Sequence, residues 1–502
     1  MFNGSVSNLR LQAGYGDDGG IVASVGGEKG TGNFAGSVSY STESVNSYEV
    51  ALGDLNGDGI LDIVTAGQDI AGGATVRLGN GNGTFGTSTF YIAESSVSNA
   101  VTLGDLNGDG ILDIVTAGSN GAAGTATVRI GNGNGTFGAG TSYSAETSNS
   151  YSVTLGDLNA DGIMDLVTTG VGGGTGRATI RLGIGNGTFG AATSYVAETV
   201  DSRGIKLGDL NGDGILDLVT AGGGGGSGKA TVRLGTGSGT FGAATSYVTE
   251  GTVSFGVNLG DLNGDGSLDL VSVGTDLGVY WATIRLGAGN GTFGTSSSYA
   301  AESANSNSIT LGDLNGDGIM DLVTAGSGAG SGRATIRLGN GNGTFGAGTS
   351  YATESTQSNG VTLGDINGDG VLDLVTSGSG AGGKATIQLG STSSGVGALL
   401  PFSLQYRHTA LQAMADLDRS LKRISAHRGH LGAFQSRIGS AINNVQITIE
   451  NFAAAESQIR DTDVAQEAAN LAKGRILQQA AASVLAQANQ EPQIALRLLQ
   501  GA

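Results

Sequence analysis

The distribution of apolar and polar residues divides the chain into two parts. Up to about residue 395, short segments such as Leu61–Thr65 and Ala74–Leu78 alternate apolar and polar residues and are separated by glycine-rich stretches. This alternation is typical of β-strands. After Gly397, apolar residues recur at steps of three and four, beginning with Leu411 and Met414. The pattern therefore predicts a β region followed by a helical region.

The β region repeats itself. The string Leu-Gly-Asp-Leu-Asn-Gly-Asp-Gly recurs at steps of 51 or 52 residues, with its first Asp at Asp54, Asp105, Asp157, Asp209, Asp261, Asp313 and Asp365. Each copy predicts four strands, because strand patterns flank the Asp-rich loop, a glycine-rich turn and an Asn-Gly turn. Four strands at this period predict a seven-bladed β-propeller; the alternative is a linear β-solenoid, whose repeats are usually shorter.

The two ends of the repeat array complement each other. Gly32–Gly36, followed by Ser39-Tyr40, matches the end of a repeat, whereas the last copy lacks this stretch after Leu389-Gly390. We expect the N-terminal segment to supply the outer strand of the seventh blade, which would hide sheet edges. The predicted domains are a strand-like lead at 1–30, the propeller at 31–395 and a helical domain at 400–502.

The helical domain predicts a coiled-coil-like assembly. Apolar residues from Leu411 to Phe452 predict one long helix with a narrow apolar seam. Arg460–Asp463 predicts a break with an N-cap, followed by a second helix from about Val464 to Ala488. Pro492 is expected either to end this helix or to start a short last turn. A lone seam cannot be buried, so it requires helices of the same chain, as in a helical hairpin, or of other chains.

Composition and charge exclude several functions. The chain has 95 Gly and no Cys, so no disulfide or thiolate site exists. Residues 1–399 carry a net charge of −21 and residues 400–502 a net charge of +2, which argues against nucleic acid as a partner. No apolar run is long enough for a membrane span. Met1–Gly20 shows no secretory signal, so we expect another export route or a true start further upstream.

The repeated loop carries the candidate chemistry. Oxygen-bearing groups fall at positions 1, 3, 5 and 9, with a backbone carbonyl at position 7 and Gly at position 6 for the sharp turn. Such a hard, flexible oxygen cage suits Ca²⁺ better than Mg²⁺. The predicted ligands are Asp54, Asn56, Asp58, Ile60 and Asp62; Asp105, Asn107, Asp109, Ile111 and Asp113; Asp157, Asn159, Asp161, Ile163 and Asp165; Asp209, Asn211, Asp213, Ile215 and Asp217; Asp261, Asn263, Asp265, Ser267 and Asp269; Asp313, Asn315, Asp317, Ile319 and Asp321; and Asp365, Asn367, Asp369, Val371 and Asp373.

The alternative for these loops is that Asp and Asn only cap turns. That alternative leaves three carboxylates in each loop without a counter-charge, which is unfavourable. Up to seven structural Ca²⁺ are therefore expected, and they would change the charge of residues 1–399 from −21 to −7. Ala160 replaces Gly at position 4 of the third loop, where all ligand positions survive.

Two further repeated features favour structural roles. An Arg recurs on the third predicted strand of six copies and is replaced by Gln388 in the last. We expect these side chains to pair with neighbouring blades; a ligand channel lined by Arg is the alternative. Asn-Gly-Thr, as at Asn82, matches a glycosylation sequon, but turn chemistry explains it more simply.

The repeats resemble the FG-GAP/VCBS family of integrin-like propellers over roughly residues 30–390. Phe85-Gly86 matches the Phe-Gly signature, whereas Val64–Gly67 stands where the family often has Gly-Ala-Pro. The resemblance implies structural Ca²⁺ in the loops and a protein or glycan as a ligand of the propeller.

Residues 405–500 resemble the C-terminal part of bacterial flagellin, through Ala433–Ile438, Asn451–Asp463 and Ala486–Gln490. The resemblance implies a helical filament core, an extracellular location and an export chaperone as a partner. It also implies that the core contains Leu431, Ile438, Phe452, Ile459, Ile476, Leu485 and Leu499. Flagellins carry N-terminal helices as well, and Leu9–Gly14 faintly resembles the hairpin that follows them, so we expect this chain to begin partway through a flagellin.

Three functions follow from these features. The first is a flagellin-like structural subunit that displays the propeller on a motility filament, and the second is a calcium-dependent surface adhesion or ligand-binding protein anchored by its helices. An enzyme is not expected, because Cys is absent and the only histidines, His408, His427 and His430, lie on the predicted helix without a nucleophile-and-base pattern.

Overall fold

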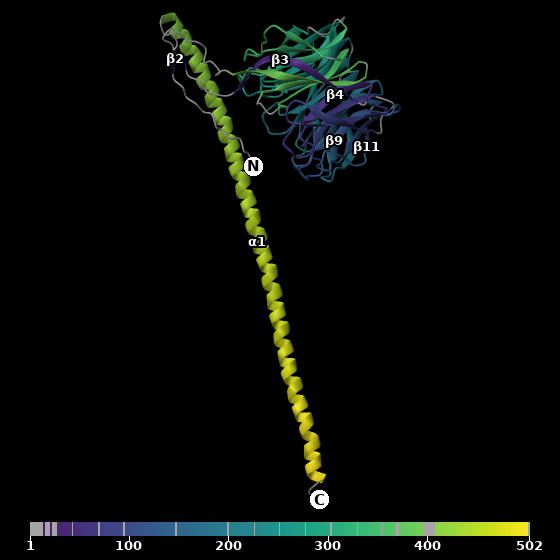
Figure 1. Ribbon diagram of the computed structural model, residues 1–502, viewed down its shortest axis with the longest axis vertical. Helices are drawn as coiled ribbons and strands as arrows, with labels where there is room; N and C mark the ends of the chain where they lie inside the picture. The colour runs from purple at the N-terminus through teal and green to yellow at the C-terminus, as the bar shows by residue number, and fades with distance from the viewer. Residues whose placement is uncertain are drawn as a thin grey trace. The chain divides into compact units, whose positions relative to one another are not determined.

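A computed structural model describes residues 14–15, 21–22, 28–394 and 407–499, apart from residues 43, 69–70, 94–95, 146–147, 198–199, 225, 250, 277, 302–303, 329, 354, 368–370 and 381. The described chain is mainly β, followed by one C-terminal helix (Figure 1). It divides into two compact units, of which one holds the strands from β3 to β30. The other holds the helix α1 together with β1 (Gly14–Tyr15) and β2 (Ile21–Val22), which pair antiparallel.

Seven repeats of up to four strands make up the β unit. The first strand of each repeat leads into the Asp-rich loop, and these strands are β4 (Asn46–Gly53), β8 (Val97–Gly104), β12 (Asn149–Gly156), β16 (Asp201–Gly208), β20 (Val253–Gly260), β24 (Ala304–Gly312) and β28 (Gln357–Gly364). The second strands follow the loop and are β5 (Asp62–Gln68), β9 (Asp113–Ser119), β13 (Asp165–Gly172), β17 (Asp217–Gly224), β21 (Asp269–Asp276), β25 (Asp321–Gly328) and β29 (Asp373–Ser379).

The third and fourth strands complete each repeat. The third strands are β6 (Gly72–Gly79), β10 (Gly124–Arg129), β14 (Thr175–Gly183), β18 (Ser227–Gly235), β22 (Val279–Gly287), β26 (Ser331–Arg337) and β30 (Lys384–Ser394). The fourth strands are β7 (Phe85–Ile92), β11 (Thr141–Ser144), β15 (Phe189–Val196), β19 (Phe241–Val248), β23 (Phe293–Ala300) and β27 (Thr349–Ala352). The predicted four-strand repeat is confirmed.

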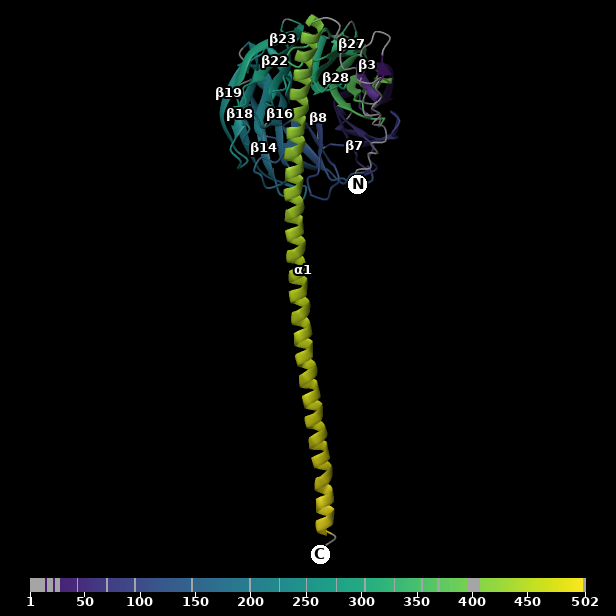
Figure 2. The ribbon, with the colours of Figure 1, turned by 90° about the vertical axis from the view of Figure 1, so that its left-hand side faces the viewer.

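Neighbouring strands within a repeat pair antiparallel, in sequence order. In the fourth repeat, Figure 2 shows β19, β18 and β16 following one another from the edge of the β unit inward. The first strand carries a bulge, as between Ser202 and Gly204, so its register with the second strand shifts by one residue. Adjacent sheets are joined by one residue pair in two places, Gly223 with Val253 and Ser379 with Asn46.

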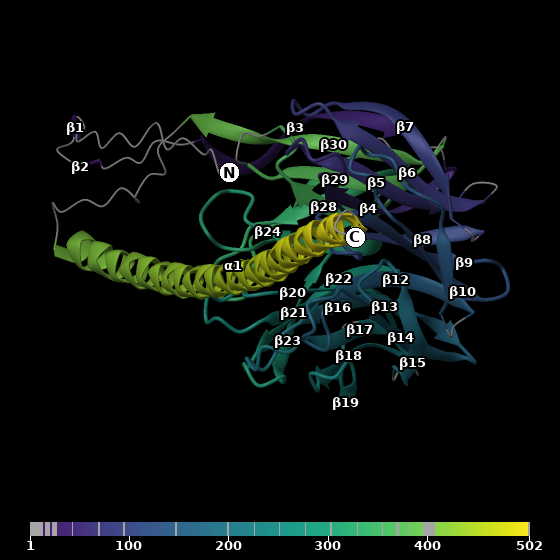
Figure 3. The same cartoon turned by 90° about the horizontal axis from the view of Figure 1, so that it is seen from below.

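The seventh repeat obtains its fourth strand from the other end of the β unit. Strand β3 (Glu28–Ser41) pairs antiparallel with β30, from Glu28 opposite Ser394 to Ser41 opposite Lys384. Figure 3 shows the two strands side by side, β3 in purple and β30 in green. The prediction that the N-terminal segment completes the last repeat is therefore confirmed.

The hydrophobic core lies between consecutive repeats. One cluster combines Val115 and Val128 of the second repeat with Leu166 and Phe189 of the third. Another combines residues of the first repeat with Val375 and Ile387 of the seventh. The first strands also contact one another in a circuit, β4 with β8, β8 with β12, β12 with β16, β16 with β20, β20 with β24, β24 with β28, and β28 with β4.

The C-terminal helix differs from the prediction in one respect. Helix α1 runs without interruption from Arg407 to Leu499, so the predicted break at Arg460–Asp463 and the predicted end at Pro492 are wrong. Asp and Thr favour helix starts, yet no Gly or Pro at 460–463 prevents the helix from continuing. Pro492 removes one N–H donor close to the helix end, where little helix remains to be disrupted.

Several predictions fall outside the residues or side chains described here. These are most of the 1–30 lead, the ligand Asp369, the three histidines, and the side chains of Leu431, Ile438, Ile459 and Leu499.

Candidate metal sites

In six of the Asp-rich loops, the first residue accepts hydrogen bonds from N–H groups of the loop backbone. The Oδ1 atom of Asp54 accepts hydrogen bonds from the N–H groups of Gly57 at 2.7 Å and Asp58 at 3.2 Å. Its Oδ2 atom accepts one from the N–H of Gly59 at 2.7 Å. Gly57 and Gly59 have φ of +76° and +80°, a conformation that side chains with a Cβ disfavour. Ala160, which replaces Gly57 in the third loop, adopts the same left-handed conformation with φ of +60°.

Positions 3 and 5 lie beside each other on the exposed part of the loop. The Nδ2 group of Asn56 donates to Oδ2 of Asp58 at 2.9 Å, and the N–H of Ile60 donates to Oδ1 of Asp58 at 2.8 Å. The third, fifth and seventh ligand positions of the prediction therefore lie next to one another.

Position 9 occupies a different environment. Asp62 is fully buried. Its Oδ2 atom accepts the N–H of Leu55 and its Oδ1 atom accepts the N–H of Gly79, both at 2.8 Å. This carboxylate joins the loop to the end of the third strand, a structural role that the sequence analysis did not predict. The same two bonds and complete burial recur at Asp113, Asp165, Asp217, Asp269, Asp321 and Asp373.

The carboxylates within a loop repel one another. Burial raises the pKa of Asp62, hydrogen bonds from backbone N–H groups lower it, and the negative charges of Asp58 and Asp54 raise it further. The same causes raise the pKa of Asp321 to about 6. The carboxylates at positions 1 and 5 thus lie near enough to disfavour ionisation of the carboxylate at position 9.

The donor chemistry of the loops fits Ca²⁺. The predicted set contains only oxygen ligands, and a divalent cation would relieve the repulsion among the carboxylates. Within the described ranges, however, no three acidic or histidine side chains gather closely enough to hold a metal ion. In this structure the loops form internal hydrogen bonds, and the carboxylate at position 1 accepts them from backbone N–H groups.

The repeated Arg residues join neighbouring repeats. Arg181 donates to the carbonyl of Gly190 in its own repeat at 2.7 Å and to that of Ser144 in the preceding repeat at 2.9 Å. Its guanidinium lies 5.5 Å from the ring centroid of Tyr143. The Tyr143 ring meets Phe189 edge-on, and its hydroxyl accepts the Phe189 N–H. We call this Tyr, Phe and Arg group the inter-repeat clasp.

The clasp recurs around the β unit. Equivalent Tyr–Phe pairs are Tyr40–Phe85, Tyr91–Phe137, Tyr195–Phe241, Tyr247–Phe293, Tyr299–Phe345 and Tyr351–Phe34. In the seventh repeat, Gln388 replaces Arg and still donates to the carbonyl of Ala352 in the sixth, at 3.1 Å. The expectation that these side chains pair with neighbouring repeats is confirmed.

The first strands surround a cavity of about 610 Å³ that the sequence analysis missed. Every first strand contributes to its lining, which includes Glu49, Tyr151, Arg203, Lys206 and Phe255. The signal available in the sequence was the variation among repeats, since the residue six before the first loop Asp is Tyr, Asn, Arg or Phe, depending on the copy.

Helix α1 exposes many apolar side chains. Phe452 is 72% exposed, and Ile476 and Leu485 are each 67% exposed. Ile476 and Leu485 are nine residues apart, which places them on opposite sides of a helix with 3.6 residues per turn. In this later part of the helix, beyond the seam predicted for Leu411–Phe452, apolar side chains are therefore exposed on opposite sides. No helix among the described residues is long and apolar enough to cross a membrane.

The helix is similar to curated flagellins. Residues 414–499 match the bacterial flagellin C-terminal helical region. Flagellin B of Vibrio cholerae serotype O1 is 41% identical over 134 residues, which cover 27% of this chain and 33% of that protein. Flagellin C of the same organism is 50% identical over 90 residues, which cover 18% of this chain and 24% of that protein. The chain thus spans a third or less of the length of these relatives.

The β unit gives a second set of similarities. A crystal structure of BBS1N in complex with ARL6DN, soaked with mercury, has a TM-score of 0.49 at 14% identity, covering 74% of this chain and 99% of that chain. The FG-GAP-like repeat matches residues 54–116, 105–168, 209–272, 261–324 and 325–376, together more than half of the chain. Both resemblances found in the sequence are confirmed: the chain belongs to the family with FG-GAP-like repeats and ends in a bacterial flagellin C-terminal helical region.

Proposed function

We propose that the chain is a flagellin-like structural subunit of a bacterial flagellar filament, and that it carries a calcium-stabilised, seven-bladed β-propeller on the filament's outer surface. Its role is structural rather than catalytic. The proposal includes an extracellular location, assembly through flagellin-type helices and an export chaperone that binds the helix.

The observation that carries this proposal is the exposed apolar surface of α1 within the flagellin-matching residues 414–499. A helix that is apolar on opposite sides needs partners on more than one side. A helical hairpin buries only one stripe, whereas the core of a helical filament surrounds each helix with others. This favours assembly over a hairpin folded on itself.

Three features support the propeller. The first strands contact one another in a circuit, the core lies between consecutive repeats, and β3 completes the seventh repeat. Such an arrangement leaves no repeat without two neighbours, as in a β-propeller. The repeated oxygen donors and the repulsion among loop carboxylates support Ca²⁺ binding.

Filament incorporation tests the structural role. Phe452→Asp and Leu485→Asp place a charge on the apolar surface and should abolish incorporation. Gln479→Asp adds the same charge at an exposed polar residue of the same helix and should be tolerated. Filaments are sheared from cells that express each variant, and peptides of residues 28–394 are quantified by mass spectrometry. Normal incorporation of both apolar variants would contradict the proposal.

The cavity between the first strands favours a second candidate, a calcium-dependent surface protein in which the β unit binds a ligand and α1 is only an anchor. Absence of the unaltered chain from filaments, together with calcium-dependent ligand binding, would support this alternative.

A further inference from the structure

The cavity between the first strands has the size of a small-molecule site. Its volume of about 610 Å³ lies within the range of roughly 300–1,000 Å³ that is usual for ligand pockets. It is lined by the residue six before the first loop Asp in every repeat and by the residue three before it.

The repeats differ from one another at this lining. The residue seven before the loop Asp is Ser in all seven repeats, and Leu-Gly directly precedes that Asp in all seven. The cavity-lining residue between them varies: Tyr48, Asn99, Tyr151, Arg203, Phe255, Asn307 and Asn359. Packing between near-identical repeats is satisfied by the same residue in each copy. Variation at the cavity therefore points to a ligand without sevenfold symmetry.

Arg203 is fixed at this surface. Its guanidinium carbon lies 5.3 Å from the ring centroid of Tyr151 and 5.0 Å from that of Phe255, so it is held between two aromatic rings. Phe255 stacks in turn on Tyr280, with ring centroids 6.3 Å apart. These contacts restrict the side chain before any ligand arrives, which lowers the entropy cost of binding.

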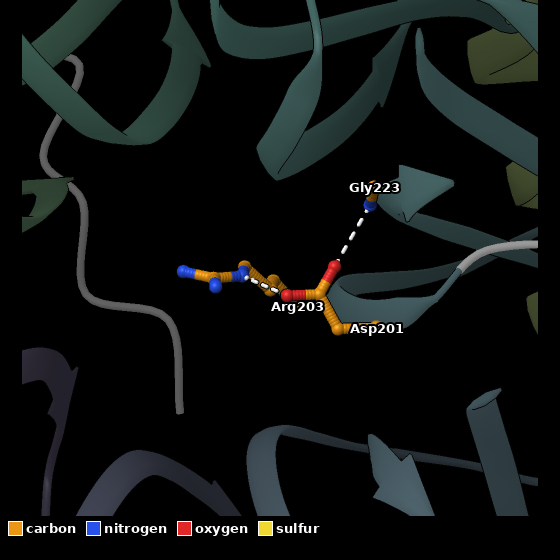
Figure 4. Close-up of polar contacts among 3 residues, drawn as sticks. All are labelled: Asp201, Arg203 and Gly223. Carbon is orange, nitrogen blue, oxygen red and sulfur yellow. Dashed lines mark hydrogen bonds and ion pairs between the residues drawn. The ribbon is translucent and has the colours of Figure 1, made fainter. Parts of the chain in front are cut away.

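The Nε group of Arg203 forms an ion pair with Asp201. It donates to Oδ2 of Asp201 at 2.7 Å, and Oδ1 of Asp201 accepts the N–H of Gly223 at 2.9 Å (Figure 4). The two terminal nitrogens of the guanidinium point away from Asp201 in Figure 4, and neither has a hydrogen-bond partner among the described residues. Asp201 therefore orients the guanidinium without occupying its outer edge.

The charge of the lining is unusual for this part of the chain. Residues 1–399 carry a net charge of −21, yet the cavity presents two cations, Arg203 and Lys206, against one carboxylate, Glu49. Hydroxyl and amide groups surround them, contributed by Thr102, Thr154, Thr310, Thr362, Asn258 and Asn307. A cationic centre within a ring of neutral hydrogen-bonding groups attracts an anion that also carries hydroxyls.

We infer that this cavity binds a small hydroxylated carboxylate with the chemistry of a uronic acid, whose carboxylate pairs with the terminal nitrogens of Arg203. A guanidinium presents two parallel N–H donors that match the two oxygens of a carboxylate. Lys206 adds a second positive charge, and the neighbouring hydroxyl and amide groups contact the ligand's hydroxyls. The inference does not depend on assembly into a filament.

Calorimetric titration of the full chain in calcium-containing buffer tests this inference, with glucuronate as the probe and glucose as the neutral analogue of the same ring. Glucuronate should bind saturably and glucose at least tenfold more weakly. Arg203→Gln should weaken glucuronate binding at least tenfold. Arg177→Gln is the matched control, because it removes the same charge from the third repeat outside the cavity lining and should leave the affinity unchanged.

Three results would overturn the inference: no saturable glucuronate binding, equal affinity for glucose, or an affinity unaffected by Arg203→Gln. Inorganic phosphate binding as tightly as glucuronate would replace the carboxylate assignment with a general anion site. If Arg203→Gln lowers the melting temperature, Lys206→Gln serves as the second variant, since the Lys206 side chain is exposed. That variant should weaken glucuronate binding severalfold, and unchanged affinity would count against the inference.

Discussion

Asp58 and Asp62 belong to the same predicted ligand set but lie in contrasting surroundings. Asp58 is exposed, whereas Asp62 is fully buried and accepts two backbone N–H groups. A buried carboxylate that satisfies two backbone donors contributes to the fold whether or not a cation is bound. Substitution of Asp58 therefore tests metal binding, whereas substitution of Asp62 tests support of the fold.

Calcium should stabilise the chain through the exposed position. Addition of millimolar Ca²⁺ should raise the melting temperature, and Asp58→Asn should reduce this rise without lowering the melting temperature in a chelator. Asp62→Asn should lower the melting temperature both with and without chelator, because one backbone donor loses its acceptor. The corresponding loss of folding free energy is about 1–3 kcal/mol. Differential scanning calorimetry of both variants, with and without chelator, checks this. A melting temperature independent of Ca²⁺ would refute structural calcium.

Glu49 should make stability depend on pH. Burial raises the pKa of Glu49 to about 7, against an ordinary value of 4.5, while the hydrogen bond from the Val101 N–H and the charge of Lys206 lower it. Between these pH values the folded chain binds more protons than the unfolded chain, so stability falls as the pH rises from 4.5 to 7. The loss is at most about 3 kcal/mol, since the residue keeps some exposure to the cavity.

Glu49→Gln removes this titration and keeps an acceptor for the Val101 N–H. The variant should melt at a higher temperature than the unaltered chain at pH 8 and at the same temperature at pH 4.5. Thermal melts of both chains across this range provide the measurement. The difference between the two chains isolates Glu49 from the loop carboxylates, which titrate in both. Parallel melting curves at every pH would show that Glu49 does not titrate in this window.

At the scale of the strand, the inter-repeat clasp explains how sheets with few hydrogen bonds between them stay together. Each clasp has an edge-on Tyr–Phe contact. In six of the seven clasps the Tyr hydroxyl accepts a backbone N–H and an Arg donates to both repeats, whereas in the seventh the Tyr351 hydroxyl donates to Oδ1 of Asn33. The seventh clasp retains only one of the hydrogen bonds through Gln388. The seventh clasp therefore shows what a Gln can replace when the Arg is absent.

Arg181→Ala should cost about 2 kcal/mol, because two hydrogen bonds from a charged donor and one cation–π contact are lost. Arg181→Gln should cost less, since the amide can reproduce the bond that Gln388 makes to Ala352. Denaturant unfolding of the two variants compares these losses. Equal losses would mean that the cation itself, rather than the hydrogen bond, holds the repeats together.

The elements also show what a sequence pattern can reveal. Strands, loops and the origin of the closing strand at Gly32–Tyr40 were predictable, because each is encoded by local periodicity and repeated many times. The break at Arg460–Asp463 was wrong because capping residues permit a helix start without requiring one. Asp62 was predicted as a ligand, but its bond to Gly79, 17 residues away, required the fold. The Arg203 site was not predicted because its partners come from three different repeats.

At the scale of the whole molecule, β3 is the element that completes the seventh repeat. Without it, β30 would present an unpaired edge, and Tyr351 would lose the contact with Phe34. β3 is itself the edge of its sheet, like the fourth strands of the other repeats, but it covers β30, whose Ile387 is buried. Exposure of such an apolar strand would promote aggregation.

Deletion of residues 28–41 should therefore lower the melting temperature and promote aggregation of the β unit. Deletion of residues 407–499 should leave its melting temperature unchanged, because the helix belongs to the other compact unit. Light scattering during thermal melts distinguishes the two deletions. A β unit that stays monomeric and equally stable without β3 would show that the seventh repeat does not require this strand.

The pairing of Glu28 with Ser394 has a mechanical consequence. The chain enters and leaves the β unit at the same end of one antiparallel pair, so more than 360 residues span only the width of two strands. A host polypeptide can accept such an insertion without separating the segments on either side. Tension applied through those segments would pull β3 and β30 apart one hydrogen bond at a time. Under load, the β unit should therefore open first between β3 and β30, while the six other repeats carry no direct force.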